Sequence, residues 1–304
     1  MKIPGKFQLI GLLLVLLFLS FPVQMYAQVK SEVAGEEAYR AVLFQLIETL
    51  QKQILSLQNQ IDRQSEKNEE EVKGLKGVVD IEAVYRVDDV EDLEKIRTKE
   101  HKEYFKRVFD IFPDNYDNKL RELIVFAGDG NEFDAFVETL PPTHTSWLYA
   151  VSSEVFDIED SLPNTELIVH ELGHIVSYEE DINIPQSRSY ECDPYFDIRG
   201  CPAENSYLNQ FAEKFWSPSD LTRASRYATK ENTSEEVLVY YKKHKNEYVS
   251  DYATYNPEED FAESFTFFVL GKVLLKGSVA REKVDFFSDY EELENIQKEI
   301  GTRL

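Results

Sequence analysis

Apolar and polar positions along the chain predict a few short strands followed by many helices. Two apolar runs of strand length stand at 123–127 and 145–152, and Gly128-Asp129-Gly130 closes the first of them. Apolar residues recur at helical spacing in the following segments: 90–112, 165–178, 203–216, 234–245, 257–269 and 290–300. Because the strands come mainly before the helices, the pattern predicts an α+β fold with a small sheet and a mostly helical C-terminal half.

Residues 1–27 have the layout of a secretory signal. Lys2 and Lys6 begin it, an almost wholly apolar run extends from Leu9 to Phe21, and Ala27 is a small residue at the expected cleavage site. The run is shorter than the roughly 20 residues of a membrane span. Counted through Ala27 it approaches that length, so an uncleaved N-terminal anchor is the alternative. Both predict a secreted or membrane-anchored protein whose remaining residues lie outside the cytoplasm.

Residues 28–77 predict a helical stalk followed by a charged linker. Apolar residues with alternating four- and three-residue spacing form a heptad seam, made of Leu43, Ile47, Leu50, Ile54, Leu57 and Ile61. About three heptads are the lower limit for a coiled coil. The seam at 43–61 therefore predicts either a weak homo-oligomer or a helix packed on the main domain. We expect that main domain to span residues 78–304.

The chain is strongly acidic, with 57 Asp and Glu against 33 Lys and Arg and a formal net charge of −24. A phosphate backbone is bound by basic surfaces, so the composition excludes a nucleic-acid-binding function. The same charge opposes electrostatic docking on anionic lipid. Such acidity is typical of a soluble surface whose charges repel one another.

The chain has two cysteines, Cys192 and Cys201. In an exported protein two cysteines this close in sequence most simply form a disulfide that staples the loop between them. The alternative is a pair of metal ligands. No further cysteine or histidine stands near them in the sequence, which favours the disulfide.

Residues 170–174 read His-Glu-Leu-Gly-His and contain the motif H-E-x-x-H. Helix residues four apart lie on one face, so His170 and His174 can hold one metal ion, and imidazole nitrogens suit Zn²⁺. Glu171 would act as general base, taking a proton from the attacking water and delivering it to the leaving amine. The alternative is a chance helix with two histidines. The apolar residues around the motif argue against this alternative, because they are typical of a buried helix. They are Leu167, Ile168, Leu172, Ile175 and Val176.

A catalytic zinc site usually has three protein ligands and one open position. His101 and His244 lie in charged segments and have the context of surface residues. His144, on a loop before a strand, is a weaker candidate. We therefore expect the third ligand to be a carboxylate from farther along the chain.

The stretch 250–264, Ser-Asp-Tyr-Ala-Thr-Tyr-Asn-Pro-Glu-Glu-Asp-Phe-Ala-Glu-Ser, resembles the second motif of gluzincin peptidases of the lethal-factor-like group, which includes the Pro-Pro endopeptidases. The resemblance implies that Glu259 is the third ligand and that Glu263 orients a ligand histidine. It also implies that Tyr252, seven residues before Glu259, faces the substrate carbonyl and donates to it in the transition state. The resemblance covers roughly 145–268, and only the two motifs are specific.

The residues alone support a less detailed interpretation of this stretch. Glu259 and Glu263 share a helix face and form the natural inward pair. A proline at the first helical position favours a solvated acidic helix start for Glu258 and Asp260. Tyr252 is one of 17 tyrosines, so an ordinary aromatic role is its alternative.

Zincins resemble one another in using a strand at the sheet edge, before the metal helix, to hold an extended peptide by backbone pairing. The strand at 145–152 is expected to be either that edge strand or a core strand. The aromatic residues that recur at helical spacing in 203–216 are expected to pack in the core.

Together these features predict a zinc-dependent endopeptidase that holds one Zn²⁺ per chain. It would hydrolyse peptide bonds of extracellular or cell-surface proteins with a water activated by the metal. One alternative is a catalytically silent, peptidase-like binding module, although loss of activity usually removes Glu171 or a ligand histidine and all three are present. The other alternative is a zinc hydrolase of cell-wall peptide.

Overall fold

The computed structural model describes residues 79–128, 134–140, 145–157, 161–178, 203, 205–228 and 234–304. Contacts along the chain divide it into Met1–Glu70 and Glu71–Leu304, and every described residue belongs to the second part. The predicted signal, the predicted stalk, His144 and the cysteine pair Cys192 and Cys201 lie outside the described residues. None of the helices in the described ranges is long and apolar enough to cross a membrane.

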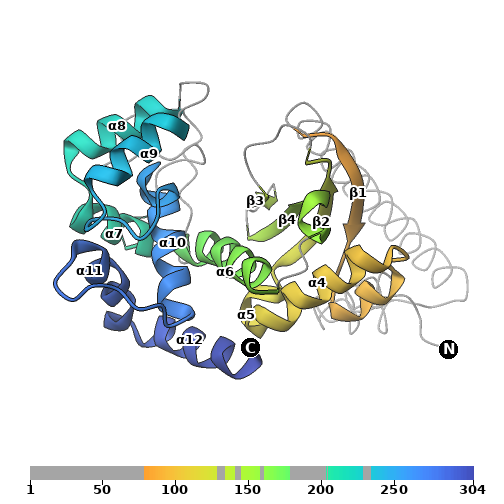
Figure 1. The fold of residues 1–304 in the computed structure, drawn as a ribbon. Helices are drawn as coiled ribbons and strands as arrows, with labels where there is room; N and C mark the ends of the chain where they lie inside the picture. The colour runs from red at the N-terminus through yellow and green to blue at the C-terminus, as the bar shows by residue number, and fades with distance from the viewer. Residues whose placement is uncertain are drawn as a thin grey trace, which may run out of the picture. The chain divides into compact units, whose positions relative to one another are not determined.

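Four strands form one mixed sheet (Figure 1). They are β1 (Ile81–Arg86), β2 (Leu120–Phe126), β3 (Ala135–Leu140) and β4 (Ser146–Ser152), in the order β1-β2-β4-β3. β2 and β4 are parallel, whereas β1 pairs with β2 and β3 pairs with β4 in antiparallel fashion. Among the described residues β4 is therefore an inner strand and β3 an edge strand. The expectation that 145–152 forms the sheet edge is wrong, and its alternative, a core strand, is right.

The inner strands each contain a run of apolar residues, 123–126 in β2 and 147–151 in β4, because both of their faces are buried there. Tyr149 and Val151 of β4 point into the main core, which they share with residues of the helices. Leu148 and Ala150 point the other way, into a smaller apolar cluster with Ile124 of β2. This alternation follows from the two-residue period of a strand.

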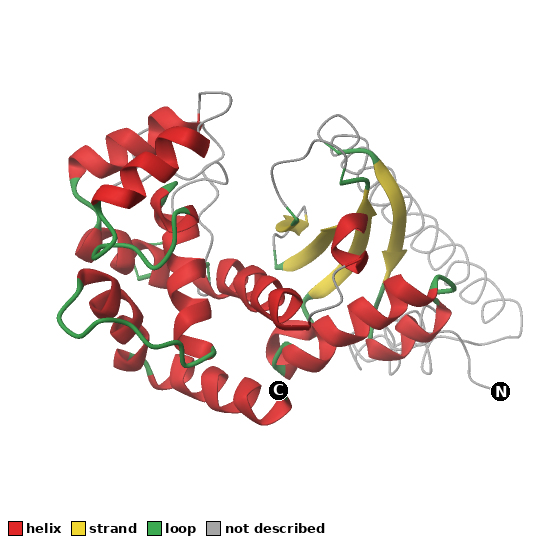
Figure 2. Cartoon of the chain, viewed as in Figure 1, coloured by secondary structure: helices red, strands yellow, loops and turns green. Residues whose placement is uncertain are grey.

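The helical elements, labelled as in Figure 1, are η1 (Val90–Lys95), α4 (Lys99–Ile111), α5 (Asp114–Asp117), η2 (Ser153–Asp157), α6 (Ser161–Ser177), α7 (Tyr207–Phe215), α8 (Pro218–Ala228), α9 (Ser234–Lys243), η3 (Tyr252–Thr254), α10 (Pro257–Val269), α11 (Val279–Phe286), η4 (Phe287–Asp289) and α12 (Glu291–Arg303). The η elements are 3₁₀ turns. The fold is α+β, a four-stranded mixed sheet followed by a mostly helical C-terminal half, as predicted (Figure 2).

The predicted helix at 90–112 is two elements, η1 and α4. The Asp89 side chain accepts a hydrogen bond from the backbone N–H of Glu91 and so caps η1. Ile96 then adopts extended dihedrals, with φ −68° and ψ 123°, and Thr98 precedes the first residue of α4. Apolar residues are buried both in η1 and in α4, so their helical spacing continues across the break. The sequence pattern therefore predicts one helix where the structure has two elements.

Helices α6 and α10 pack against each other at the centre of the described region, and α6 also contacts β3 and α4 of the sheet half (Figure 1). α10 in turn contacts α7, α11 and α12. Phe261 and Phe265 of α10 meet Phe211 of α7 and Phe287 of η4 in edge-on ring contacts. Phe211 is fully buried, which confirms the expected core role of this aromatic residue of 203–216.

Candidate metal centre

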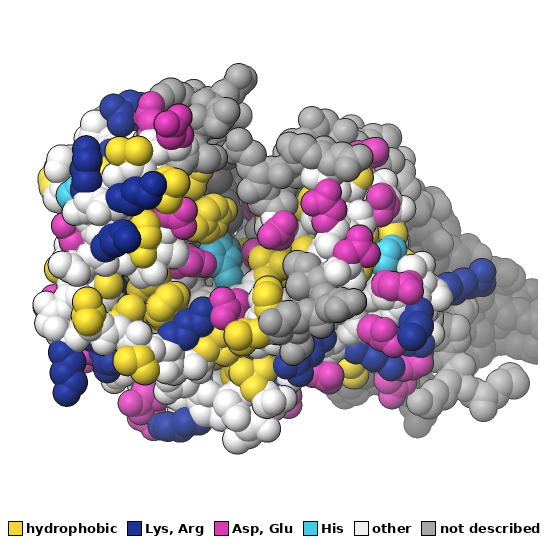
Figure 3. Space-filling model, viewed as in Figure 1, with side chains coloured by type: hydrophobic (Ala, Val, Ile, Leu, Met, Phe, Trp, Pro, Cys, Tyr) yellow, Lys and Arg dark blue, Asp and Glu magenta, His cyan; other side chains and the backbone are white. Residues whose placement is uncertain are grey.

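Helix α6 carries the H-E-x-x-H residues in a buried setting. Its apolar residues between Ile168 and Val176 are almost fully excluded from solvent, so the polar residues between them lie inside the protein. His170 and His174 stand one turn apart on one face, and their Nε2 atoms are 3.1 Å from each other. The face in Figure 3 shows histidine surface at its middle, bordered by apolar and acidic side chains.

Helix α10 brings a carboxylate to the two histidines. Its first turn is fixed by the Asn256 side chain, which accepts from the backbone N–H of Glu259 at 2.7 Å, and by Pro257 at the first helical position. Glu259 Oε2 then lies 3.1 Å from His170 Nε2 and 3.4 Å from His174 Nε2. Two nitrogens and one oxygen, from two helices far apart in sequence, thus converge on one point.

The spacing of these three atoms fits a zinc ion. A tetrahedral site with bonds of about 2.0–2.1 Å places neighbouring ligand atoms about 3.3 Å apart. The sides of the triangle formed by His170, His174 and Glu259 measure 3.1, 3.1 and 3.4 Å. Within the described ranges this is the group of His, Cys, Asp or Glu residues whose atoms could hold a metal ion. The buried group is therefore consistent with a zincin-like site.

Glu263, one turn after Glu259, contacts the other side of the His170 ring. Its Oε1 lies 2.8 Å from His170 Nδ1, a hydrogen bond that leaves Nε2 directed at the convergence point. Partners of this kind fix the orientation of a ligand imidazole and increase its basicity. The structure thus brings together His170, His174, Glu259 and Glu263.

The charges around the site favour a cation. Burial opposes the charged form of His170, but hydrogen bonds with Glu259 and Glu263 outweigh it and raise the pKa of His170 well above its ordinary value. Burial also opposes the charge of Glu259, yet the neighbouring His174 and His170 hold the pKa of the Glu259 carboxyl well below its usual range. The carboxylates of Glu259 and Glu263 thus favour positive charge at this point, and a divalent cation would replace the proton that they stabilise on His170.

Tyr252 begins the 3₁₀ turn η3 beside this group. Its ring centroid lies 5.8 Å from that of His170, and the residue is 39% exposed, so it stands between the site and solvent. The charge of Glu259, then burial and the charge of Glu171, raise the pKa of the Tyr252 hydroxyl well above its ordinary value. The hydroxyl is therefore protonated at neutral pH and is a donor.

Glu171 is only 2% exposed and follows His170 on α6. Its negative charge contributes to the raised pKa values of both His170 and Tyr252. The remaining described histidines take no part. His101 Nδ1 lies 2.8 Å from the Tyr85 hydroxyl, and His244 Nδ1 lies 2.8 Å from a Glu247 oxygen.

Asp260 and Glu258 depart from the expectation of a solvated acidic helix start, because both are buried. Asp260 is 0% exposed and its Oδ2 contacts Lys283 Nζ at 2.5 Å and the Trp216 indole N–H at 2.9 Å. Burial raises the pKa of the Asp260 carboxyl even with Lys283 beside it. This pair could not be predicted from the pattern of apolar residues, because Lys283 lies in α11, which is not among the predicted helices.

No protein-family model, curated protein or solved structure matches this chain significantly. The resemblance to gluzincins therefore rests on the two motifs and on the geometry of the His170, His174 and Glu259 group. That group also shows what the site can do. Imidazole nitrogens and a carboxylate are ligands that suit Zn²⁺, and a second buried carboxylate, that of Glu171, follows His170 on the same helix.

Gly173→Ala should destabilise the protein and weaken zinc binding. A Cβ at Gly173 would lie 2.9 Å from the Ala262 Cα and 3.3 Å from Phe265 Cδ1, so α10 would have to move away from α6. Overpacking of this kind typically costs about 1–3 kcal/mol, and here it would separate candidate ligands carried by different helices. Denaturant unfolding and a zinc titration measure the two effects.

Gly301→Ala in α12 is the matched control, since its Cβ would meet nothing within 4 Å. It should leave zinc binding unchanged and raise stability by up to about 1 kcal/mol, because alanine is the better helix former. If the Gly173 and Gly301 variants had equal stability and equal zinc affinity, the close contact between α6 and α10 would not be what holds the candidate ligands together.

Proposed function

We propose that this protein is a zinc-dependent endopeptidase that holds one Zn²⁺ per chain through His170, His174 and Glu259. The observation that carries the proposal is the convergence of their three donor atoms at tetrahedral ligand spacing, inside the protein and beside a further carboxylate. When bound there, zinc would supply Lewis acidity, polarising the scissile carbonyl and lowering the pKa of water.

Glu171 has the position of a general base in this proposal. It lies on the same helix as the two histidines and is buried. Its negative charge contributes to the raised pKa values of His170 and Tyr252. A carboxylate in a poorly solvated site is a stronger proton acceptor than one in water. Glu171 would take a proton from the attacking water and deliver it to the leaving amine.

Tyr252 would act as the donor to the oxyanion of the tetrahedral intermediate. The negative charges around it keep its hydroxyl protonated, and its partial exposure leaves it within reach of a substrate bound at the surface. Because the same negative charges would repel a second anion, the donor role depends on the positive charge that zinc brings to the site. Removing one oxyanion donor typically costs about 10²–10³ in kcat.

The proposed substrates are peptides in extended conformation. β3 is an edge strand in contact with α6, and edge strands bind peptides by adding a strand to the sheet. The substrate class of extracellular or cell-surface proteins rests on the predicted signal at 1–27. Incubating the purified protein with a peptide library, with and without a zinc chelator, tests for hydrolysis. A zinc-loaded protein that cleaves none of the peptides would favour the silent binding module.

The wild-type protein should contain about one zinc per chain, and Glu259→Ala should bind zinc at least about 100-fold more weakly. Removing a residue that only hydrogen-bonds to a metal ligand already lowers metal affinity about 10–100-fold. Glu259 is expected to cost more, because its own oxygen is one of the three candidate ligand atoms. Elemental analysis and chelator competition measure both. Glu292→Ala, on the exposed start of α12, is the control and should keep its zinc. Unchanged affinity in Glu259→Ala would assign the third ligand to another residue.

A further inference from the structure

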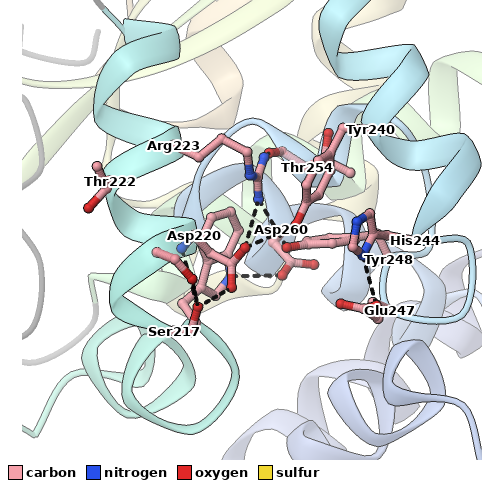
Figure 4. A network of polar contacts seen from close by, with 12 residues as sticks. Ser217, Asp220, Thr222, Arg223, Tyr240, His244, Glu247, Tyr248, Thr254 and Asp260 are labelled. Carbon is pink, nitrogen blue, oxygen red and sulfur yellow. Dashed lines mark hydrogen bonds and ion pairs between the residues drawn. The ribbon is translucent and has the colours of Figure 1, made fainter.

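Arg223 of α8 is a largely buried cation in a network of polar contacts with residues of other elements (Figure 4). Its side chain is only 10% exposed. Nη1 donates to the Thr254 carbonyl oxygen at 2.6 Å, and Nη2 donates to the Tyr248 hydroxyl at 3.1 Å. The guanidinium also lies 3.7 Å from the centre of the Tyr240 ring, a stacking that fixes its plane.

The carbonyl that Arg223 holds belongs to the turn that carries Tyr252. Thr254 is the last residue of η3 and Tyr252 the first. Continuing the 3₁₀ turn would give the Thr254 carbonyl a partner three residues later, at Pro257, whose nitrogen carries no hydrogen. The end of η3 therefore needs a donor from outside the turn, and Arg223 supplies it.

The same network reaches the helix of the third candidate ligand. The Tyr248 hydroxyl accepts from Arg223, and the face of the Tyr248 ring lies 3.8 Å from Lys283 Nζ. Lys283 contacts Asp260, the residue that follows Glu259 on α10. Arg223 thus stands at one end of a buried chain of contacts whose other end is the first turn of α10.

We propose that Arg223 is a positioning residue that sets the place of Tyr252 beside His170 by holding the Thr254 carbonyl. The proposal rests on the proposed peptidase function for its effect on turnover. It requires the planar fork of arginine, which donates to Thr254 and Tyr248 at once while stacking on Tyr240. A lysine keeps the charge but offers no such fork, so Tyr252 would lose its fixed distance from the reacting carbonyl.

The first test compares Arg223→Lys with Arg303→Lys in the full chain. Arg303 also donates to a backbone carbonyl, that of Phe112 at 2.7 Å, and to the side chain of Asp114, but these residues lie outside the site. Arg223→Lys should lower kcat about 10-fold or more, since small misplacements of a catalytic group are costly. Its zinc content should be unchanged and its KM should change by less than about 2-fold. Arg303→Lys should match the wild type in all three.

A double-mutant cycle with Tyr252→Phe separates positioning from general damage. If Arg223 acts through the Tyr252 hydroxyl, Arg223→Lys should have little further effect on kcat in the Tyr252→Phe background. An equal loss of kcat in both backgrounds would overturn the proposal, and so would a wild-type kcat in Arg223→Lys.

A second readout does not depend on hydrolysis. With 3-fluorotyrosine placed at position 252, Arg223→Lys should shift or broaden the ¹⁹F resonance and Arg303→Lys should leave it unchanged. If the wild type cleaves no peptide, the proposed function fails while this spectrum still decides the role of Arg223. Should Arg223→Lys not fold, Tyr248→Phe removes one partner of the guanidinium and should give a smaller change of the same resonance. An unchanged resonance in the variant that folds would overturn the proposal.

Discussion

Glu171→Gln is expected to lose nearly all peptide hydrolysis while keeping one zinc per chain. Glutamine has the size and shape of glutamate and is neutral, so the buried position next to His170 stays filled. It cannot take a proton from water, and general acid–base catalysis contributes typically about 10²–10⁴-fold. The loss should therefore fall on kcat, with KM changed much less. Kinetics on a cleaved peptide and elemental analysis measure the two quantities.

Glu166→Gln is the matched control on the same helix. Glu166 stands one turn before His170, is partly exposed, and pairs with Lys272 at 2.8 Å rather than with the metal centre. Removing its charge should change kcat by no more than about 2-fold, because exposed ion pairs contribute little. If Glu171→Gln instead released the zinc, Glu171 would be a ligand or its support, and if it retained activity, another residue would be the base.

The parts of the site that could be predicted from sequence are those with local causes. The bounds 257–269 of α10 coincide with the prediction, because Asn256 caps the helix and Pro257 occupies its first position. The spacing of His170 and His174 on one helix likewise implies one shared face. The position of Glu259 needed the resemblance of 250–264 to a known motif, since the residues alone allowed several carboxylates.

The parts that could not be predicted depend on partners distant in sequence. β1 alternates between half-buried and exposed residues and contains Glu82 and Arg86, so its apolar run is only three residues long. β3 similarly includes Glu138 and Thr139. Their strand structure comes from pairing with β2 and β4, which the local pattern does not contain. The signal at 1–27, the seam at 43–61 and the disulfide between Cys192 and Cys201 stay predictions.

Lys283→Met is expected to lower the free energy of unfolding by about 3–5 kcal/mol, the usual cost of removing one partner of a buried ion pair. Lys283 is 1% exposed and Asp260 is 0% exposed, so water cannot replace the lost ammonium. Trp216 and Ser264 would still donate to the carboxylate, but two neutral donors do not balance a buried charge. Urea unfolding with a chelator present measures the loss without a contribution from bound zinc.

Two further variants test this reason for the loss. Lys298→Met breaks the exposed pair of Lys298 with Glu294, at 3.2 Å, and should cost no more than about 0.5 kcal/mol. Adding Asp260→Asn to Lys283→Met removes the buried negative charge but keeps an acceptor for the Trp216 indole, so it should restore about 1–3 kcal/mol. If the double variant is no more stable than Lys283→Met, the loss comes from the contact of the Lys283 ammonium with the Tyr248 ring, and the charge of Asp260 is not its cause.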